Sequence, residues 1–389
     1  MTSENPFRYK TRVVNVGNLP MGGEYPVRVQ SMTNTDTLDT KATVAQAIRM
    51  IEAGCEYVRI AVPYMREAEN LRKIKKELRR QGYQTPIIAD VHFNAQIAEV
   101  CATIVEKVRI NPGNYVPLRI TRHASNEKNP GIMVEEIADR LSPLLKICKE
   151  HGTAIRIGVN HGSLSKRIMN RYGDTPLGMV ESALEFASIC ESFSFRDLVL
   201  SMKASNIRLM VAANRLLAER MKQAGMDYPI HLGVTEAGAG ENGRIKSAIG
   251  IGSLLVDGIG DTVRVSLTED PEFEMPAAYS ILQSTGVRIT KTEFIACPSC
   301  GRTQYNIQKA LEEIQLKTSH LMGLKIAVMG CVVNGPGEMA DAHYGFVGAG
   351  SGKIHLYKGQ SLVKKNLDES QAVDALVELI KDSGDWIDE

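Results

Sequence analysis

The sequence predicts an α/β protein in which a (β/α)8 TIM barrel is followed by a smaller α+β domain. Two observations support this prediction. Residues up to about 270 alternate short β-branched runs with longer amphipathic segments, and this alternation then stops. Short apolar strands separated by helices are typical of a parallel sheet that is buried on both faces. At 389 residues, the chain is also longer than a single hydrophobic core usually supports.

Eight segments of the first part have the short length and β-branched content of buried strands. Amphipathic patterns separate them, for example at 40–53, 65–81 and 175–191. Eight such units within about 250 residues fit a (β/α)8 barrel, although an open doubly wound sheet has a similar pattern. A Gly22-Gly23 turn between apolar runs at 12–29 suggests a hairpin that closes the bottom of the barrel. The predicted strands are 27–32, 57–62, 86–91, 107–111, 154–159, 197–203, 230–234 and 262–267.

We predict three segments along the chain. A substrate-binding barrel occupies 1–270, a connector occupies 271–292, and the α+β domain occupies 293–389. The barrel pattern ends at an acidic, proline-containing stretch, 269–272, which places the first boundary. In the last segment we expect a strand at 325–329 and amphipathic helices at 305–316 and 371–381.

Composition limits the classes of function. Hydrophobic residues make up 43% of the chain and charged residues 23%, as in soluble globular proteins. The net charge is +1, so no overall field attracts nucleic acid or a membrane surface, and the aromatic and basic patch of a nucleic-acid-binding module is absent. The first eight residues lack an apolar leader, and no apolar run reaches roughly 18 residues. We therefore expect a cytoplasmic protein with no nucleic-acid or membrane partner.

Arginine recurs in four predicted strands, each time between β-branched residues and close to the strand end. Side chains alternate along a strand, and the outer face of a barrel needs apolar residues against its helices, so these arginines should point into the lumen. Buried, unpaired guanidinium groups cost several kcal/mol, which predicts a pocket for a compact anion such as a diphosphate. Solvated arginines at the rim are the alternative, and Asp90 could neutralise part of the charge. The cations are Arg59, Arg109, Arg156 and Arg264, with Lys203 as a fifth.

Polar residues collect at the C-terminal ends of the predicted strands, where barrels of this kind place their active sites. Glu236 precedes a glycine-rich loop at 237–243, a common phosphate-binding feature, and is a candidate general acid. Any one of these residues alone would be an ordinary loop residue, so the prediction depends on their joint placement. The others are Asp90, His92, Asn111, Asn160, Thr235 and Ser266.

Seven cysteines in a cytoplasmic chain favour metal binding or catalysis over disulfides. Cys297, Cys300 and Cys331 lie close together near the C-terminus, and their thiolates suit soft metals. On spacing alone, a zinc site completed by His343 and an iron–sulfur cluster fit equally well. Glu338 lies on the same segment as Cys331 and would be a weak, displaceable fourth ligand for a cluster iron. The remaining cysteines are predicted to be small buried residues: Cys55, Cys101, Cys148 and Cys190.

Two segments around these cysteines, 294–300 and 330–338, resemble the cluster site of the 4-hydroxy-3-methylbut-2-enyl diphosphate synthase family of the non-mevalonate isoprenoid pathway. The resemblance covers nearly the whole chain in order. It extends to 29–35, 109–114, 156–160 and 231–238. It implies a TIM barrel joined to an α+β iron–sulfur domain.

The resemblance also implies a reaction and its residues. In the family, 2-C-methyl-D-erythritol 2,4-cyclodiphosphate is opened reductively and loses a hydroxyl group, which gives (E)-4-hydroxy-3-methylbut-2-enyl diphosphate. One [4Fe-4S] cluster per chain would be held by Cys297, Cys300, Cys331 and Glu338, and Glu236 would supply a proton. Substrate contacts would come from Arg59, Arg109, Arg156, Asn160, Lys203, Thr235, Arg264 and Ser266, with Asp90, His92 and Asn111 at the same mouth.

The resemblance implies partners as well. Family members take electrons from ferredoxin or flavodoxin. They form homodimers in which the cluster domain of one subunit covers the barrel mouth of the other. The alternative that we keep open is a zinc-stabilised TIM-barrel enzyme that acts on another phosphorylated small molecule.

Overall fold

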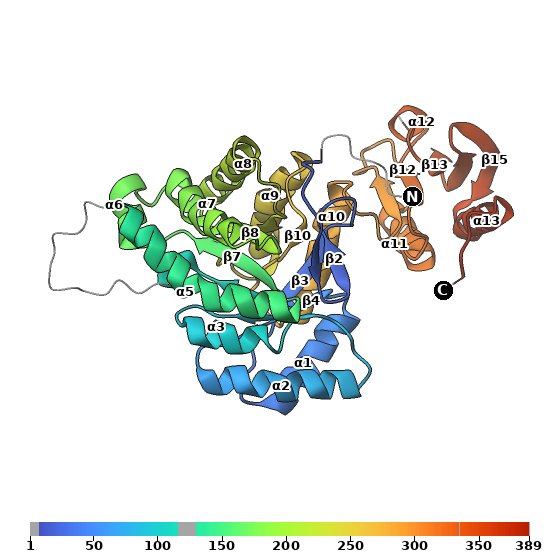
Figure 1. Ribbon diagram of the computed structural model, residues 1–389. Helices are drawn as coiled ribbons and strands as arrows, with labels where there is room; N and C mark the ends of the chain where they lie inside the picture. Colours follow the sequence, from blue (N-terminus) through green and yellow to red (C-terminus); the bar gives the residue numbers. More distant parts are fainter. Residues whose placement is uncertain (1–7, 116–129, 334, 389) are drawn as a thin grey trace. The chain divides into compact units, whose positions relative to one another are not determined.

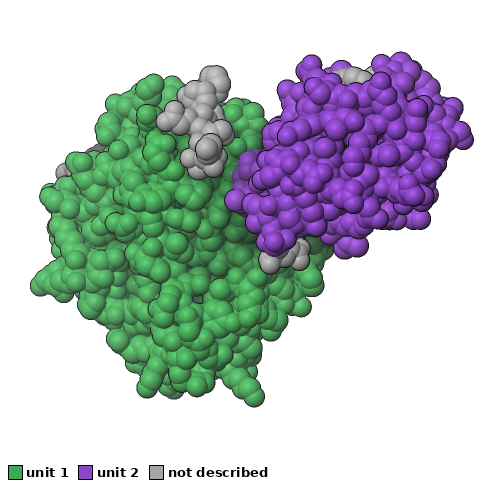
Figure 2. Space-filling model, turned by 90° about the vertical axis from the view of Figure 1, so that its right-hand side faces the viewer, with its two compact units in different colours: residues 1–288 green, residues 289–389 purple. Residues whose placement is uncertain are grey.

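The computed structural model describes residues 8–115, 130–333 and 335–388 (Figure 1). The chain divides into two compact units, Met1–Arg288 and Ile289–Glu389 (Figure 2). The first seven residues, on which the expected lack of a leader partly rests, lie outside the described parts, as does Asn334 of the cysteine segment. In the described parts, no helix is both long and apolar enough to cross a bilayer.

The first unit is a closed barrel of eight parallel strands, which confirms the predicted fold class. Neighbouring strands pair in the order β8-β7-β6-β5-β4-β3-β10-β9. A parallel bridge between Leu200 and Ile230 joins the two ends and closes the ring. The strands are β3 (Arg28–Met32), β4 (Tyr57–Ala61), β5 (Ile87–Asp90), β6 (Lys107–Ile110), β7 (Ala154–Asn160), β8 (Leu198–Lys203), β9 (His231–Leu232) and β10 (Thr262–Val263).

Each barrel strand is followed by a helix that packs on the outside. Several helices start at a side chain that accepts a hydrogen bond from the first turn, as Asp39, Asn94, Thr175 and Asn206 do. The long helices are α1 (Thr40–Glu52), α2 (Met65–Arg80), α3 (Ala95–Ala102), α5 (Pro130–His151), α7 (Pro176–Ser192), α8 (Ile207–Gln223), α9 (Gly240–Val256) and α10 (Glu274–Ser284). Short elements are α4 (Pro112–Tyr115), α6 (Lys166–Tyr172) and the 3-10 turn η2 (Pro271–Phe273).

The stretch 271–292, which we expected to be a connector, contains α10. Buried residues of this helix, among them Met275 and Leu282, belong to the barrel core. α10 therefore supplies the helix of the eighth β/α unit. The boundaries at 270 and 292 stay a prediction.

A hairpin of β1 (Val14–Val16) and β2 (Leu19–Met21) closes the N-terminal end of the barrel. Val14, Val16 and Met21 pack against lumen residues at the start of four strands, namely Tyr57, Ile88, Ala154 and Val199. We placed its turn at Gly22-Gly23, which was wrong. The two strands are joined at Gly17, where φ is +58°, a backbone conformation that favours glycine.

The second unit is a five-stranded mixed sheet with helices. The strands lie in the order β11-β12-β13-β14-β15, the first three parallel and the last two added antiparallel. Its core includes Ile314 of α11 and Leu376 of α13. The elements are β11 (Glu293–Ala296), α11 (Ile307–Thr318), β12 (Lys325–Met329), α12 (Gly335–Glu338), β13 (Tyr344–Gly350), β14 (Lys353–Lys358), β15 (Ser361–Asp368) and α13 (Glu369–Asp382).

Candidate active site

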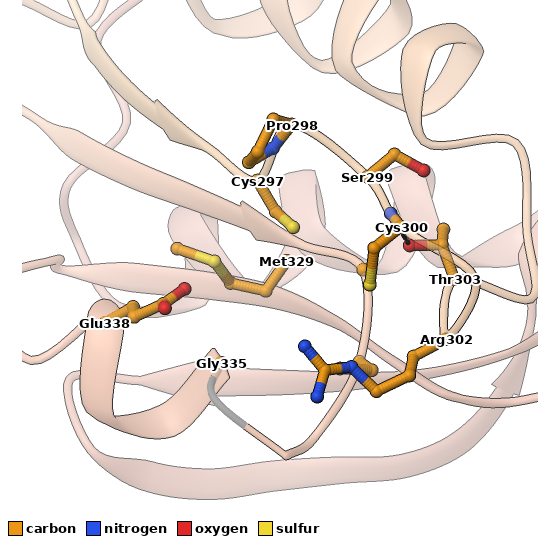
Figure 3. Close-up of a pocket in the computed structure, with 11 residues that line it drawn as sticks. Cys297, Pro298, Ser299, Cys300, Arg302, Thr303, Met329, Gly335 and Glu338 are labelled. Atoms are coloured by element: carbon orange, nitrogen blue, oxygen red, sulfur yellow. Dashed lines mark hydrogen bonds between the residues drawn. The ribbon is translucent and has the colours of Figure 1, made fainter.

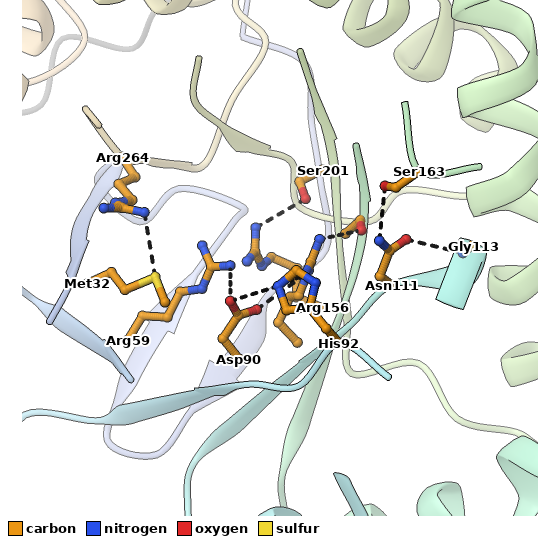
Figure 4. A network of polar contacts seen from close by, with 12 residues as sticks. Met32, Arg59, Asp90, His92, Asn111, Gly113, Arg156, Ser163, Ser201 and Arg264 are labelled. Carbon is orange, nitrogen blue, oxygen red and sulfur yellow. Dashed lines mark hydrogen bonds and ion pairs between the residues drawn. The ribbon is translucent and has the colours of Figure 1, made fainter. Parts of the chain in front are cut away.

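The barrel lumen gathers five positively charged side chains at its C-terminal end. Arg59, Arg109 and Arg156 are only 7%, 2% and 1% exposed, and Lys203 is 5% exposed. Arg264 is half-buried. It lies just after β10, which ends at Val263 and is shorter than the predicted strand at 262–267. Figure 4 shows Arg59, Arg156 and Arg264 in the lumen, as side-chain alternation predicted. We name these five residues the cation cage.

Asp90 is the carboxylate at the centre of this network. It pairs with Arg59 at 2.7 Å and with Arg109 at 3.3 Å, and the ring of His92 lies 3.1 Å from it. Burial alone would raise the pKa of Asp90, but the charges of Arg59 and Arg109 outweigh burial and hold it well below its ordinary value. Asp90 therefore stays ionised and orients two arginines.

Glu274, the first residue of α10, is the second carboxylate that meets the cage. Its oxygens lie 3.3 Å from Arg264 and accept hydrogen bonds from Ser31 and from the backbone of Leu267. Asp90 and Glu274 thus pair with three of the five cage cations, and Arg156 and Lys203 have no carboxylate partner among the described residues. The excess positive charge is the main electrostatic feature of this site.

The guanidinium group of Arg156 is only partly paired. Its Nη1 donates to Ser201 Oγ at 3.2 Å, whereas Nε and Nη2 have no partner among the described residues. Burial, followed by the charges of Arg59 and Arg109, holds the pKa of Arg156 well below its ordinary value. Burial also lowers the pKa of Lys203, helped by Arg156. Buried donors of this kind are matched by an anion with several oxygens.

Two glycines, which sequence reasoning missed, give the cage its room. Arg109 Nη2 donates to the carbonyl of Gly158 at 2.9 Å, and a Cβ at Gly158 would lie 2.5 Å from Arg109 Nε. A Cβ at Gly233 would lie 2.8 Å from Lys203 Nζ. Gly158 stands two residues after Arg156, so strand alternation could have placed it on the same inward face.

The other predicted polar residues lie around the mouth. Asn111 is buried. Its Nδ2 donates to Ser163 Oγ, and its Oδ1 accepts a hydrogen bond from the backbone N–H of Gly113. The carbonyl of Asn160, the last residue of β7, accepts a hydrogen bond from Ser163 Oγ. The sequence places Ser163 after the same strand, but its contact with Asn111 could not be predicted, since only the fold brings the two loops together. Ser266 lies half-buried beyond β10.

Glu236 lies in the segment after β9, and its carboxylate has no partner among the described residues. Thr235 donates its backbone N–H to Ala204, the residue after Lys203, so the segment lies beside the end of β8. Glu236 is exposed and has φ of +53°, which is uncommon for a residue other than glycine. Strained backbone of this kind is frequent at functional sites, and this position suits an acid that meets substrate from the solvent side.

The second unit brings Cys297, Cys300, Cys331 and Glu338 to one pocket (Figure 3). Cys297 follows β11 and Cys331 follows β12, and these strands are parallel neighbours with Ala296 opposite Val328. The carboxyl ends of parallel neighbours meet at one edge of a sheet, which places both thiols there.

Local structure shapes this pocket. Ser299 has φ of +71°, so the backbone turns sharply between Cys297 and Cys300. The backbone N–H of Arg302 and then its guanidinium lower the pKa of the Cys300 thiol, which favours the thiolate. α12 carries Glu338 and is held to the sheet by Met339, whose buried side chain packs in one cluster with Met329 and Cys297.

The described residues do not form a site for a single metal ion. No three of their histidine, cysteine or acidic side chains converge on one point. The zinc site completed by His343 is wrong. Nδ1 of His343 accepts a hydrogen bond from the backbone N–H of Lys325, which is the first residue of β12. Cys331 follows the opposite end of this strand, so the histidine lies away from the thiols. Three thiols and a carboxylate spread around one pocket suit a larger cluster better than one zinc ion.

These two sites define a class of protein: a TIM barrel with a cation-lined mouth, joined to a domain with a three-cysteine pocket. Residues 11–279 match the family description "GcpE TIM-barrel domain", and residues 293–382 match "GcpE protein C-terminal domain". The chain therefore belongs to the GcpE family. This confirms the resemblance seen in the sequence.

Two relatives are named 4-hydroxy-3-methylbut-2-en-1-yl diphosphate synthase (ferredoxin). The protein of Picosynechococcus sp. is 54% identical over 98% of this chain and 94% of its own length. That of Trichormus variabilis is 55% identical over the same shares of both chains. Among solved structures, Burkholderia cenocepacia dihydropteroate synthase has a TM-score of 0.46 and 12% identity over 72% of this chain and 99% of its own, which is too low to bear on function.

We predict that Gly158→Ala weakens binding of inorganic pyrophosphate about 10- to 100-fold. The new methyl group would push Arg109 off the carbonyl of residue 158, and a charge-assisted hydrogen bond is worth about 1.5–3 kcal/mol. Titration calorimetry measures the affinity. Gly252→Ala is the control, since its Cβ would meet Thr285 at an ordinary 3.7 Å. Equal affinity of Gly158→Ala and wild type would contradict this account of Arg109.

Proposed function

We propose that this protein catalyses the reductive ring opening and dehydroxylation of 2-C-methyl-D-erythritol 2,4-cyclodiphosphate to (E)-4-hydroxy-3-methylbut-2-enyl diphosphate, a step of isoprenoid precursor biosynthesis. The protein is an iron–sulfur oxidoreductase. The observation that carries the proposal is the excess of buried cations at the barrel mouth, in a chain more than half identical to named synthases.

The reaction balances with two electrons and one proton. The cyclic diphosphate dianion becomes a linear diphosphate trianion and one water. The C–O bond that closes the ring breaks, a hydroxyl leaves as water, and a C=C bond forms. Net negative charge on the diphosphate therefore rises during turnover, and a rigid set of cations stabilises that change.

The chain's own residues divide this work. Arg59, Arg109, Arg156, Lys203 and Arg264 bind and orient the diphosphate. Asn111, Asn160, Thr235 and Ser266, with His92 and Asp90, complete the mouth. Glu236 donates the proton from its carboxyl group to the departing hydroxyl.

The thiol pocket fits an iron–sulfur cofactor by its donor set. Cys297, Cys300, Cys331 and Glu338 would hold one [4Fe-4S] cluster per chain, which supplies single electrons and a Lewis-acidic iron when bound. The backbone N–H and the guanidinium of Arg302 lower the pKa of Cys300, which favours the thiolate form that such ligation needs. A ferredoxin donates the electrons, as the names of the relatives suggest; flavodoxin is the other carrier to test.

We propose that the barrel segment, 1–270, binds substrate and that segment 293–389 binds the cluster. The chain works as a cytoplasmic homodimer, in which the cluster domain of one subunit covers the barrel mouth of the other. α9 supports pairing, because Ile245, Ile249 and Val256 are 48%, 55% and 66% exposed. Their spacing places them on one side of the helix, and an apolar stripe in water favours association.

We predict that Glu236→Gln lowers the turnover of the cyclic diphosphate about 10²- to 10⁴-fold, the usual contribution of a general acid. Anaerobic turnover with a chemical reductant, followed by mass spectrometry, measures the rate. Iron content and substrate affinity should stay at wild-type levels, whereas Cys331→Ser should lose iron. Wild-type protein that holds iron and binds the ring but never opens it would contradict the proposed function.

We predict that Glu236→Gln and Cys300→Ser subunits complement each other in mixed dimers. A one-to-one mixture should reach about one quarter of wild-type activity, because half of the dimers are mixed and each has one intact shared site. Ile249→Asp added to both chains should abolish pairing and complementation, as light scattering and activity assays would show. Mixed dimers no more active than either parent would refute the shared site.

A further inference from the structure

Below the cation cage, the lumen holds a layer of polar side chains that the proposed reaction does not use. Gln30, Lys107, His231 and Thr262 are each 0% exposed. Each has side-chain polar atoms with no hydrogen-bond partner among the described residues. They lie on four different strands, β3, β6, β9 and β10, so they approach the barrel axis from several sides. Buried polar groups without partners are rare and require an explanation.

Lys107 is the member of this layer that can carry charge at high pH. It stands two residues before Arg109 in β6, so it points into the same lumen about 7 Å nearer the bottom. Its Nζ lies 4.7 Å from the ring centroid of Tyr57. Tyr57 in turn packs against the β1–β2 hairpin. Lys107 is therefore enclosed between the hairpin and the cage.

The surroundings of Lys107 disfavour its charged form. Asp90 is already paired with Arg59 and Arg109, and the hairpin offers apolar side chains. Burial, then the charges of Arg156 and Arg59, hold the pKa of Lys107 well below its ordinary value of 10.5. The titratable or charged groups that face it are Tyr57 and Arg59 of β4, Asp90 of β5, Arg109 of β6, Arg156 of β7, Lys203 of β8 and His231 of β9.

An anion in the cage changes this balance. Two negative charges bound by Arg59 and Arg156 would offset the positive field that disfavours the charged form of Lys107. The linear product then adds one more negative charge at the same place. A proton on Lys107 would balance part of this charge without any movement of the barrel.

We propose that Lys107 is the floor of the anion site and takes up a proton when a diphosphate binds, so that binding and protonation are linked. Only the identity of the anion rests on the proposed function. Lys107 has the higher pKa in the bound state, so affinity falls as pH rises through the window between the free and bound values.

Titration calorimetry on the oxidised holoenzyme, without reductant, tests this inference. Binding heats measured in buffers of different ionisation enthalpy give the number of protons taken up per site between pH 7 and 9.5. The probes are the cyclic diphosphate, whose two phosphorus atoms each carry an ester and so do not titrate near neutrality, and sulfate. Because sulfate is a simple anion, proton uptake on sulfate binding tests the inference even if the cyclic diphosphate is not the substrate.

We expect wild-type protein to take up a measurable fraction of a proton, and Lys107→Met to lose more than half of it. Methionine fills similar space without charge. Lys73→Met, at an exposed position on α2, is the control and should match wild type. His231→Gln should keep most of the uptake, since burial and the charges of Lys203 and Arg156 hold the pKa of that histidine well below 6.5.

Three results overturn the inference. One is no proton uptake by wild type with either probe, which needs no variant to be folded. Another is uptake by Lys107→Met equal to that of wild type. The last is loss of uptake in His231→Gln alone, which would assign the proton to the histidine.

Discussion

Uncompensated positive charge inside the barrel is the constraint on which the rest of the structure depends. Buried guanidinium and ammonium groups are stable only when oriented and paired, and here Asp90 and Glu274 pair with part of the set. The remaining donors of Arg156 are left for a ligand. The β1–β2 hairpin packs into the other end of the lumen, so we expect an anion to enter from the mouth.

The thiol pocket follows a different principle. Parallel β11 and β12 bring Cys297 and Cys331 to one sheet edge, and a tight turn at Ser299 adds Cys300. Glu338 completes the set from a short helix. Three soft ligands and one hard ligand would suit the redox centre that we propose, because the hard ligand is the more easily exchanged for an oxygen of the substrate. In the proposed function, the barrel supplies fixed charge and the second unit supplies the ligands of the redox centre.

Much of this arrangement could be predicted from sequence, because it depends on the two-residue period of side chains along a strand and on the spacing of the cysteines. Alternation along strands places Arg59, Arg109 and Arg156 inside, and the cysteine spacing marks the second site. Contacts between residues that are far apart in the sequence were missed, because only the tertiary fold brings them together. Glu274 meets Arg264 only because α10 packs on the barrel. In the second unit, β13 is mostly buried but rich in glycine, and β15 is largely exposed. Neither therefore has the apolar sequence by which a buried strand is predicted.

The buried cations of the cage should bind an anion between them in the barrel lumen. Anomalous X-ray diffraction from crystals soaked in selenate, an analogue of sulfate and phosphate, tests it most directly. We expect a selenium peak within hydrogen-bonding reach of Nη2 of Arg156 and of the Arg59 side chain. Full selenate occupancy on the protein surface with none in the lumen, or guanidinium groups turned out towards solvent, would contradict it.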